Sequence, residues 1–242
     1  DTDRLRDDIE SNAEFGALDD VDGRGRTVLT GSEADRRARD YFVDQLEAAS
    51  FDVRIDPVGN VAGRWVAPSA DPDAAPVAMG SHLDSVPEGG IFDGPLGVYG
   101  ALEAARAIQA SAVEPARPID VVAFTEEEGG RFDVGLLGSS VASGDRDLDD
   151  ALELTDETGT SLADYLEGIG YDGTDDLRMD AWDAWFEIHI EQGLQLESAG
   201  VSAGVVTAIN GITNCDVRID GHADHGSTPM AHRTDAMTAA SE

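Results

Sequence analysis

The sequence predicts an α/β protein in which helices cover the faces of a sheet. Three short apolar segments, residues 61–66, 76–80 and 119–124, have the length and composition of buried strands. Between the last two, residues 96–108 carry apolar side chains at helical spacing. Strands and helices therefore alternate along the chain, and that order is typical of a sheet with helices packed on it.

The N-terminal elements follow the same rules. Residues 5–18 predict a loosely amphipathic first helix. Ser32 and Asp35 resemble a capping box at the start of a second helix. Residues 51–55 alternate between polar and apolar side chains as a strand does, and residues 57–60 have the composition of a turn into the next strand.

The pattern is less regular after residue 124. Residues 145–183 are acidic and predict an irregular helical connection. We expect strands over residues 186–193, 201–209 and 213–219, followed by a helix that continues to the end of the chain. The character of the sequence changes at Gly211, which suggests the start of a second domain.

The charge balance restricts the classes of partner. The chain has 16 basic residues, all of them arginine, against 50 acidic residues, and its formal net charge is −34. Such a surface repels nucleic acid and anionic membranes, so we expect neither as a partner. The acids are spread over the chain, and with no lysine present they indicate a halophilic protein, kept soluble where salt screens the repulsion.

Cysteine content and hydropathy indicate the compartment. A single cysteine, Cys215, excludes an internal disulfide and argues against a cysteine-based zinc site. No run of apolar residues reaches transmembrane length, and the first residues lack the character of a signal peptide. We therefore expect a cytoplasmic protein.

A first group of candidate site residues follows the strand at 76–80. His82 and Asp84 lie where that strand passes into a loop, and Asp93 lies in the glycine-rich loop before the next helix. His82 and Asp93 can converge on a metal ion, and the Asp84 carboxylate can receive the other ring N–H of His82 and fix the ring. The alternative for each residue alone is an ordinary solvated loop.

A second group follows the strand at 119–124. Three glutamates, residues 126–128, come directly after it, and catalytic groups in open α/β sheets lie beyond the carboxyl ends of strands. In so acidic a protein the alternative is a solvated turn. His189 stands beside Glu191 and Gln192, which favours a site over a purely structural histidine.

In this order, the motifs resemble the amidase/hydantoinase/carbamoylase branch of the two-metal aminoacylase and carboxypeptidase-G superfamily. Members of the branch include N-carbamoyl-L-amino-acid hydrolases, β-ureidopropionases and allantoate amidohydrolases. The resemblance covers almost the whole chain and rests on GSHLDS at 80–85, GGIFDG at 89–94, FTEEEGGRF at 124–132, HIEQG at 189–193 and the stretch 221–230.

The resemblance implies a centre of two divalent metal ions. His82 and His189 would bind one ion, Glu128 would bind the second, and Asp93 would bridge them. Imidazole and carboxylate ligands make Zn²⁺ the expected ion, with Mn²⁺ or Co²⁺ tolerated. The family's last metal-binding histidine has no counterpart before residue 242.

The resemblance also implies catalytic roles. Glu127 would be the general base, because the family's glutamate pair stands directly before the glycine, and Glu126 would then be a variable acid. His225 would stabilise the tetrahedral intermediate in a neighbouring subunit, although the family's usual loop after this histidine is one residue longer than residues 225–229 here. Gln192 would contact the substrate.

The implied fold is a mixed-sheet, zinc-exopeptidase-like catalytic domain with helices on both faces, joined to an α+β lid that makes a homodimer. We place the catalytic domain at residues 1–210, without its C-terminal part, and the beginning of the lid at residues 211–242. The implied reaction is hydrolysis of a C–N bond in a linear ureido or amide small molecule.

Two other functions stay open. One is an aminoacylase or peptidase of the same superfamily, which His189 in HIEQG disfavours because peptidase relatives usually carry an acid there. The other is an inactive remnant that acts only as a metal-binding or interaction domain.

Overall fold

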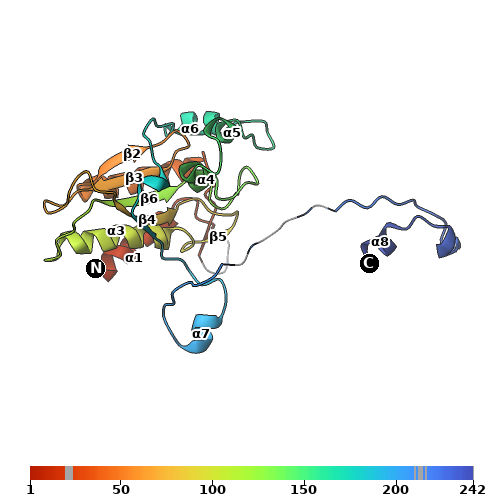
Figure 1. Cartoon of the computed structure of the whole chain (residues 1–242). Coiled ribbons are helices and arrows are strands. Elements are labelled where there is room, and N and C mark those ends of the chain that lie inside the picture. The colour runs from red at the N-terminus through yellow and green to blue at the C-terminus, as the bar shows by residue number, and fades with distance from the viewer. Residues whose placement is uncertain (20–23, 210, 212–214, 216, 242) are drawn as a thin grey trace. The chain divides into compact units, whose positions relative to one another are not determined.

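The computed structural model describes residues 1–19, 24–209, 211, 215 and 217–241. The chain divides into two compact units, Asp1–Gln192 and Gly193–Glu242. Figure 1 shows the elements of both along the colour ramp. The sheet and its covering helices belong to the first unit.

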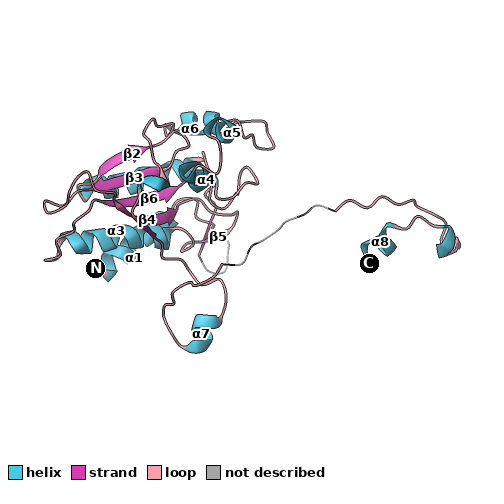
Figure 2. Ribbon diagram, viewed as in Figure 1, coloured by secondary structure: helices cyan, strands magenta, loops and turns pink. Residues whose placement is uncertain are grey.

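The first unit is built on a five-stranded mixed sheet with the strand order β2-β3-β6-β4-β7 (Figure 2). The strands are β2 (Asp52–Ile55), β3 (Val61–Trp65), β6 (Ile119–Phe124), β4 (Val77–His82) and β7 (Ala184–Phe186). The first three pair antiparallel, whereas β6, β4 and β7 run parallel. In the β4–β6 register His82 lies opposite Phe124, so both strands end at the same edge and the polar residues after them meet there.

Helices cover both faces of this sheet, as the sequence predicts. On one face lie α1 (Thr2–Ala13), α2 (Glu33–Ala48) and α3 (Pro95–Gln109). Their apolar residues form one core with the strands, and the rings of Phe42 and Tyr99 meet edge to face at 6.2 Å.

The opposite face is covered by α4 (Leu137–Ser143) and η1 (Met179–Ala181). Strand residues Ala62, Val122 and Phe124 pack there with Ala142 of α4 and the neighbouring Trp182 and Trp185. A buried acid of β6, Asp120, ties this region together by accepting hydrogen bonds from Arg64, Arg54 and Trp182.

Capping residues in the sequence account for where two of the helices begin. Ser32 caps α2 by accepting from the amide of Asp35 at 3.1 Å, but the Asp35 carboxylate accepts from the amide of Gly31 and from Arg39 instead of closing a capping box. A complete capping box, Ser161 with Asp164, begins α6 (Leu162–Ile169) after α5 (Leu148–Leu152).

A two-stranded ribbon flanks the site loops. It pairs β1 (Gly25–Arg26) antiparallel with β5 (Gly89–Gly90). Arg26 is fully buried, and its Nη2 donates to the carbonyl oxygens of Leu83 and Asp84. The ribbon therefore supports the loop that follows His82.

Two of the expected strands are wrong, and a third is not found in its described part. The strand expected over 186–193 overlaps β7 only at Phe186, because β7 ends there with its pairing to β4. Residues 201–209 form no strand, since no described strand pairs with them and a lone strand leaves its amides and carbonyls unpaired. The strand expected over 213–219 falls partly outside the described residues, and the described ones are not in a strand.

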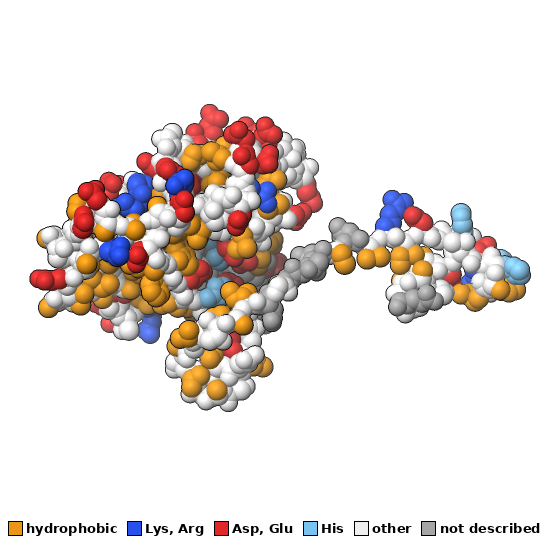
Figure 3. All heavy atoms as spheres, in the orientation of Figure 1, with side chains coloured by type: hydrophobic (Ala, Val, Ile, Leu, Met, Phe, Trp, Pro, Cys, Tyr) orange, Lys and Arg blue, Asp and Glu red, His pale blue; other side chains and the backbone are white. Residues whose placement is uncertain are grey.

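The second unit contains short helices, α7 (Gln195–Ala199), η2 (Met230–His232) and α8 (Ala236–Ala240). In the part of the chain that the structure describes, no helix combines the length and apolar character needed to cross a bilayer. Figure 3 shows acidic side chains scattered over the visible face of the first unit, as the composition indicates.

Candidate metal centre

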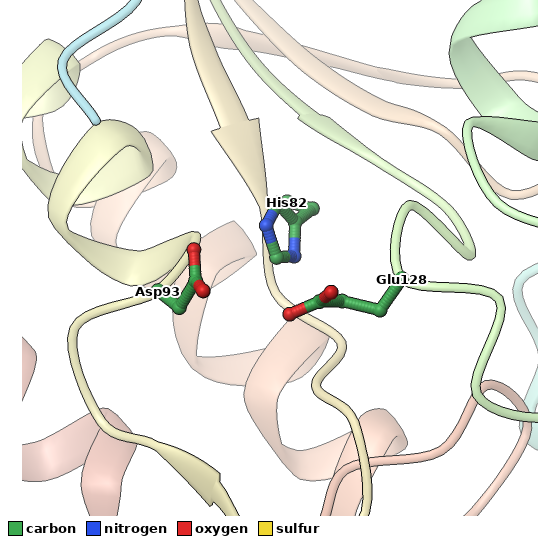
Figure 4. A group of neighbouring side chains, drawn as sticks. All are labelled: His82, Asp93 and Glu128. Atoms are coloured by element: carbon green, nitrogen blue, oxygen red, sulfur yellow. The ribbon is translucent and has the colours of Figure 1, made fainter. Parts of the chain in front are cut away.

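Three side chains from separate segments converge beyond the sheet edge. One ligand atom from each of His82, Asp93 and Glu128 lies within 4.8 Å of the others (Figure 4). His82 is the last residue of β4, Asp93 precedes α3, and Glu128 follows β6. The parallel pairing of β4 and β6 brings these segments together at one edge of the sheet.

The approach of Asp93 to His82 depends on the residue that follows it. Gly94 has φ +80°, and a Cβ at that position would lie 2.6 Å from Nδ1 and Cε1 of the His82 ring. Pro95 then begins α3, where its fixed φ suits the first helical turn. Glycine is therefore required for the loop to hold Asp93 beside the imidazole.

Asp84 connects His82 to the glutamates. His82 Nδ1 lies 3.1 Å from the Asp84 carbonyl oxygen and 3.5 Å from its carboxylate, so a proton on Nδ1 is held there and Nε2 is left free to bind a metal. The two carboxylate oxygens of Asp84 accept from the amides of Glu127 at 3.2 Å and Glu128 at 3.1 Å. Asp84 thus positions the ring through its carbonyl oxygen and its nearby carboxylate, and the same carboxylate positions the backbone of both glutamates.

The electrostatics show an excess of negative charge. Burial opposes the imidazolium of His82, but the hydrogen bond and charge of Asp84, with the charges of Glu127 and Glu128, raise the pKa of His82 to about 9. Burial and the neighbouring acids, opposed by His82, raise the pKa of Glu127 and Glu128. A crowded set of acids with one histidine between them is suited to binding a cation.

His189 and Gln192 both contact Asp93. His189 Nε2 lies 3.2 Å from Asp93 Oδ1, and Gln192 Nε2 donates to Asp93 Oδ2 at 2.9 Å. His189 is exposed and lies in a loop after β7, so it reaches Asp93 but is not among the three residues whose ligand atoms converge. The segment that carries HIEQG therefore reaches the acid that the resemblance assigns as the bridging ligand.

Glu127 lies at the rim of the cluster. Its Oε2 is 3.7 Å from His82 Nε2, and its side chain is 33% exposed. It also lines a cavity of about 210 Å³ together with Phe124, Trp185 and Glu187. Its carboxylate therefore lies beside the candidate metal ligands and can also contact a small molecule in the cavity.

Glu187 is an acid of this region that the sequence does not single out, and Glu126 is one that the resemblance leaves without a role. Glu126 is fully buried, so the alternative of a solvated glutamate turn is wrong for it. Glu187 accepts from the hydroxyl of Ser81 at 2.6 Å beside the cavity. The sequence contains no pattern that separates Glu126 from its neighbours, because its burial depends on the path of the loop.

His225 belongs to the second unit and is exposed. Its Nδ1 lies 2.8 Å from the hydroxyl of Ser227, and Arg233 donates to its carbonyl oxygen at 2.9 Å. Its part in catalysis stays a prediction.

The mixed sheet, with acids and a histidine at the carboxyl ends of its parallel strands, defines an α/β fold with a group of side chains that could hold a metal ion. Comparison with known proteins gives the same class: the family model described as peptidase family M28 matches residues 60–166.

The names of individual similar proteins indicate a narrower class than the family model does. The N-carbamoyl-L-amino acid amidohydrolase of Geobacillus stearothermophilus is 41% identical over 235 residues, 95% of this chain and 56% of that protein. Ureidoglycolate hydrolase of Arabidopsis thaliana is 36% identical over 239 residues, 95% of this chain and 50% of that protein. The chain spans about half the length of these curated relatives.

A solved structure agrees with them. The crystal structure of a hydantoinase/carbamoylase family amidase from Burkholderia ambifaria matches with a TM-score of 0.82 and 38% identity, covering 100% of this chain and 58% of that one. These relatives and this solved structure support the amidase/hydantoinase/carbamoylase branch that the motifs indicate.

Proposed function

We propose that this chain belongs to an enzyme that hydrolyses a C–N bond in a linear ureido or amide compound, such as an N-carbamoyl-L-amino acid, allantoate or β-ureidopropionate. The observation that carries the proposal is the convergence of His82, Asp93 and Glu128 beside Glu127, with Asp84 holding both the ring and the glutamate backbone. The names of the similar proteins support this substrate class.

In this proposal two divalent cations would be held by His82, Asp93, Glu128 and His189. Carboxylate and imidazole donors suit Zn²⁺ and accept Mn²⁺ or Co²⁺. The local excess of acid, with Asp84 fixing the histidine, fits such ions. Bound divalent ions polarise a carbonyl group and lower the pKa of water.

Glu127 is the proposed general base. Its position at the rim, partly exposed and 3.7 Å from His82 Nε2, lets it take a proton from the attacking water and pass that proton to the leaving nitrogen. General acid–base catalysis of this kind contributes roughly 10²–10⁴-fold. Its backbone is fixed by Asp84, so the carboxylate starts from a defined place.

Two further roles complete the proposal. His225 donates a hydrogen bond to the developing oxyanion in a neighbouring subunit of a homodimer formed through the lid. Gln192 contacts the substrate, and its hydrogen bond to Asp93 indicates that it also orients that carboxylate.

A substrate panel in concentrated salt tests the proposal. N-carbamoyl amino acids, allantoate and β-ureidopropionate are assayed for ammonia release with Zn²⁺, Mn²⁺ or Co²⁺, beside Glu127→Gln and the exposed-acid control Glu88→Gln. We expect ammonia from at least one ureido compound, and its loss in Glu127→Gln alone. Metal binding without turnover of any compound would favour the interaction-domain alternative.

A peptidase or aminoacylase is the second candidate, because the matching family model is that of a peptidase family. N-acyl amino acids and dipeptides in the same panel decide between the two. Turnover of these compounds, with none of the carbamoyl compounds, would overturn the ureido assignment.

A further inference from the structure

Glu126 is the buried member of the glutamate run. Its side chain is fully buried, whereas Glu127 and Glu128 reach the candidate metal centre. Its backbone φ of +52° lies in the left-handed region, which residues other than glycine rarely adopt. Such outliers cluster where the surrounding structure imposes them for function.

The loop of residues 125–138, here called the acidic loop, is closed on itself. Backbone amides on its returning side donate to carbonyls on its outgoing side, in the pairs Asp133 to Gly129 at 3.0 Å, Leu136 to Glu127 at 2.8 Å, Leu137 to Glu126 at 3.1 Å and Gly138 to Thr125 at 2.8 Å. The acidic loop therefore holds the two site glutamates near its start.

The Glu126 carboxylate bridges the interior of the acidic loop. Its Oε1 accepts from the amide of Arg131 at 2.7 Å and from the amide of Phe132 at 3.0 Å. Phe132 is itself buried, and its ring meets that of Tyr165 edge to face at 6.1 Å. The carboxylate thus anchors the start of the acidic loop to a part of it that is fixed in the core.

The same residue adjoins the contacts that set Glu127 and Glu128. On one side, Asp84 accepts hydrogen bonds from the amides of Glu127 and Glu128. On the other side, the residue before them, Glu126, is held by the bond that its carboxylate accepts from the Arg131 amide. Arg131, whose amide binds Glu126, donates through Nε to the carbonyl oxygen of Thr30 and lies over the Tyr165 ring at 4.1 Å. The glutamate backbone is therefore held from two directions.

We propose that Glu126 is a positioning residue that aims Glu128 at the metal and Glu127 at the substrate through its hydrogen bonds across the acidic loop. The inference rests on the proposed function, since it takes those two roles from it. Glu126 itself contacts neither metal nor substrate. It supplies a hydrogen-bond acceptor whose distance from the backbone is set by the length of the glutamate side chain.

This role predicts an order among substitutions. Glu126→Gln keeps the length and the acceptor oxygen, and the Thr30 hydroxyl beside the carboxylate can accept from the new amide. Glu126→Asp keeps the charge but is one methylene shorter, so it cannot reach both amides. Glu126→Ala removes the acceptor. A residue needed for its charge would show the opposite order for the first two.

The experiment measures Zn²⁺ affinity by competition with a chelator and hydrogen exchange of the Arg131 and Phe132 amides in the metal-free protein. The control is Asp120→Ala, which removes an equally buried acid from β6, the strand before the acidic loop. We expect Glu126→Asp and Glu126→Ala to lower Zn²⁺ affinity by about 10- to 100-fold and to speed exchange at both amides.

Glu126→Gln and Asp120→Ala should keep Zn²⁺ affinity within about twofold, and Asp120→Ala should lower thermal stability alone. If Glu126→Ala does not fold, the Asp and Gln variants decide. Wild-type affinity in Glu126→Asp, or loss of affinity in Glu126→Gln, would overturn the proposal. If the wild-type protein binds no Zn²⁺, the proposed function fails, whereas the exchange measurement still tests the anchoring role.

Discussion

The replacement Asp84→Asn tests how the site is assembled. The Asp84 carboxylate accepts from the amides of Glu127 and Glu128 with separate oxygens, at 3.2 and 3.1 Å, and lies 3.5 Å from His82 Nδ1. Asparagine has nearly the same shape but presents an NH₂ group where one oxygen was. One of the two amides then faces a donor and loses its partner.

The size of the effect follows from these contacts. A hydrogen bond to a charged group contributes about 1.5–3 kcal/mol, and a tenfold change in affinity corresponds to about 1.4 kcal/mol. If the lost bond frees the glutamate backbone, Zn²⁺ affinity should fall roughly 10- to 100-fold, the range seen when a group that orients a metal ligand is removed. His82 also loses its negative neighbour, which acts in the same direction.

Zn²⁺ affinity is measured by competition with a fluorescent chelator, and thermal unfolding is followed in the same samples. Asp120→Asn is the matched control, because Asp120 is also fully buried and accepts hydrogen bonds from several donors, yet lies away from the metal cluster. Asp84→Asn binding Zn²⁺ within about twofold of the wild-type protein would refute the positioning role of Asp84.

Four further predictions use other parts of the molecule. Glu127→Gln should retain metal and fold but lower turnover by at least about 10²-fold in steady-state assays of the full enzyme, and unchanged turnover would remove Glu127 as the base. His225→Ala should lower turnover more than metal content, and mixing it with Glu127→Gln should restore activity in verified mixed dimers if His225 acts across subunits. Lowering salt to about 0.1 M should unfold the protein in part, since the acidic surface is then less screened, and an unchanged circular dichroism spectrum would contradict this. Burial, opposed by hydrogen bonds from Asn60 and Val58, raises the pKa of Asp56 to about 6, so the folded state binds this proton more tightly than the unfolded state. Its contribution to the free energy of unfolding should fall as pH rises from about 4 to about 6, and comparing the denaturation midpoints of Asp56→Asn and wild type over that range should show the difference.

Much of the site could be predicted from the sequence because its signals are local. The segment GSHLDS ends a strand, GGIFDG precedes a helix with Pro95 at its start, and the glutamates follow another buried strand. Polar residues at the carboxyl ends of strands in an α/β sheet meet at one edge, so His82, Asp93 and Glu128 could be placed together before any coordinates. The structure brings these three together.

Tertiary structure decided what depends on partners distant in sequence. Residues 186–193 alternate like a strand, but β7 ends at Phe186, where its pairing with β4 stops, so His189 lies in a loop. Pairing across a sheet is a long-range property, and alternation alone cannot say where it ends.

The three glutamates at residues 126–128 show most clearly what the sequence determines and what tertiary structure decides. Glu126, Glu127 and Glu128 are chemically identical in the sequence, and only the path of the acidic loop buries the first and sends the other two to the site. A buried carboxylate is stable only where amides reach it, and the amides of Arg131 and Phe132 reach Glu126 because the loop turns back on itself. The sequence determined which chemical groups are available, and the closure of the loop determined which of them positions the others.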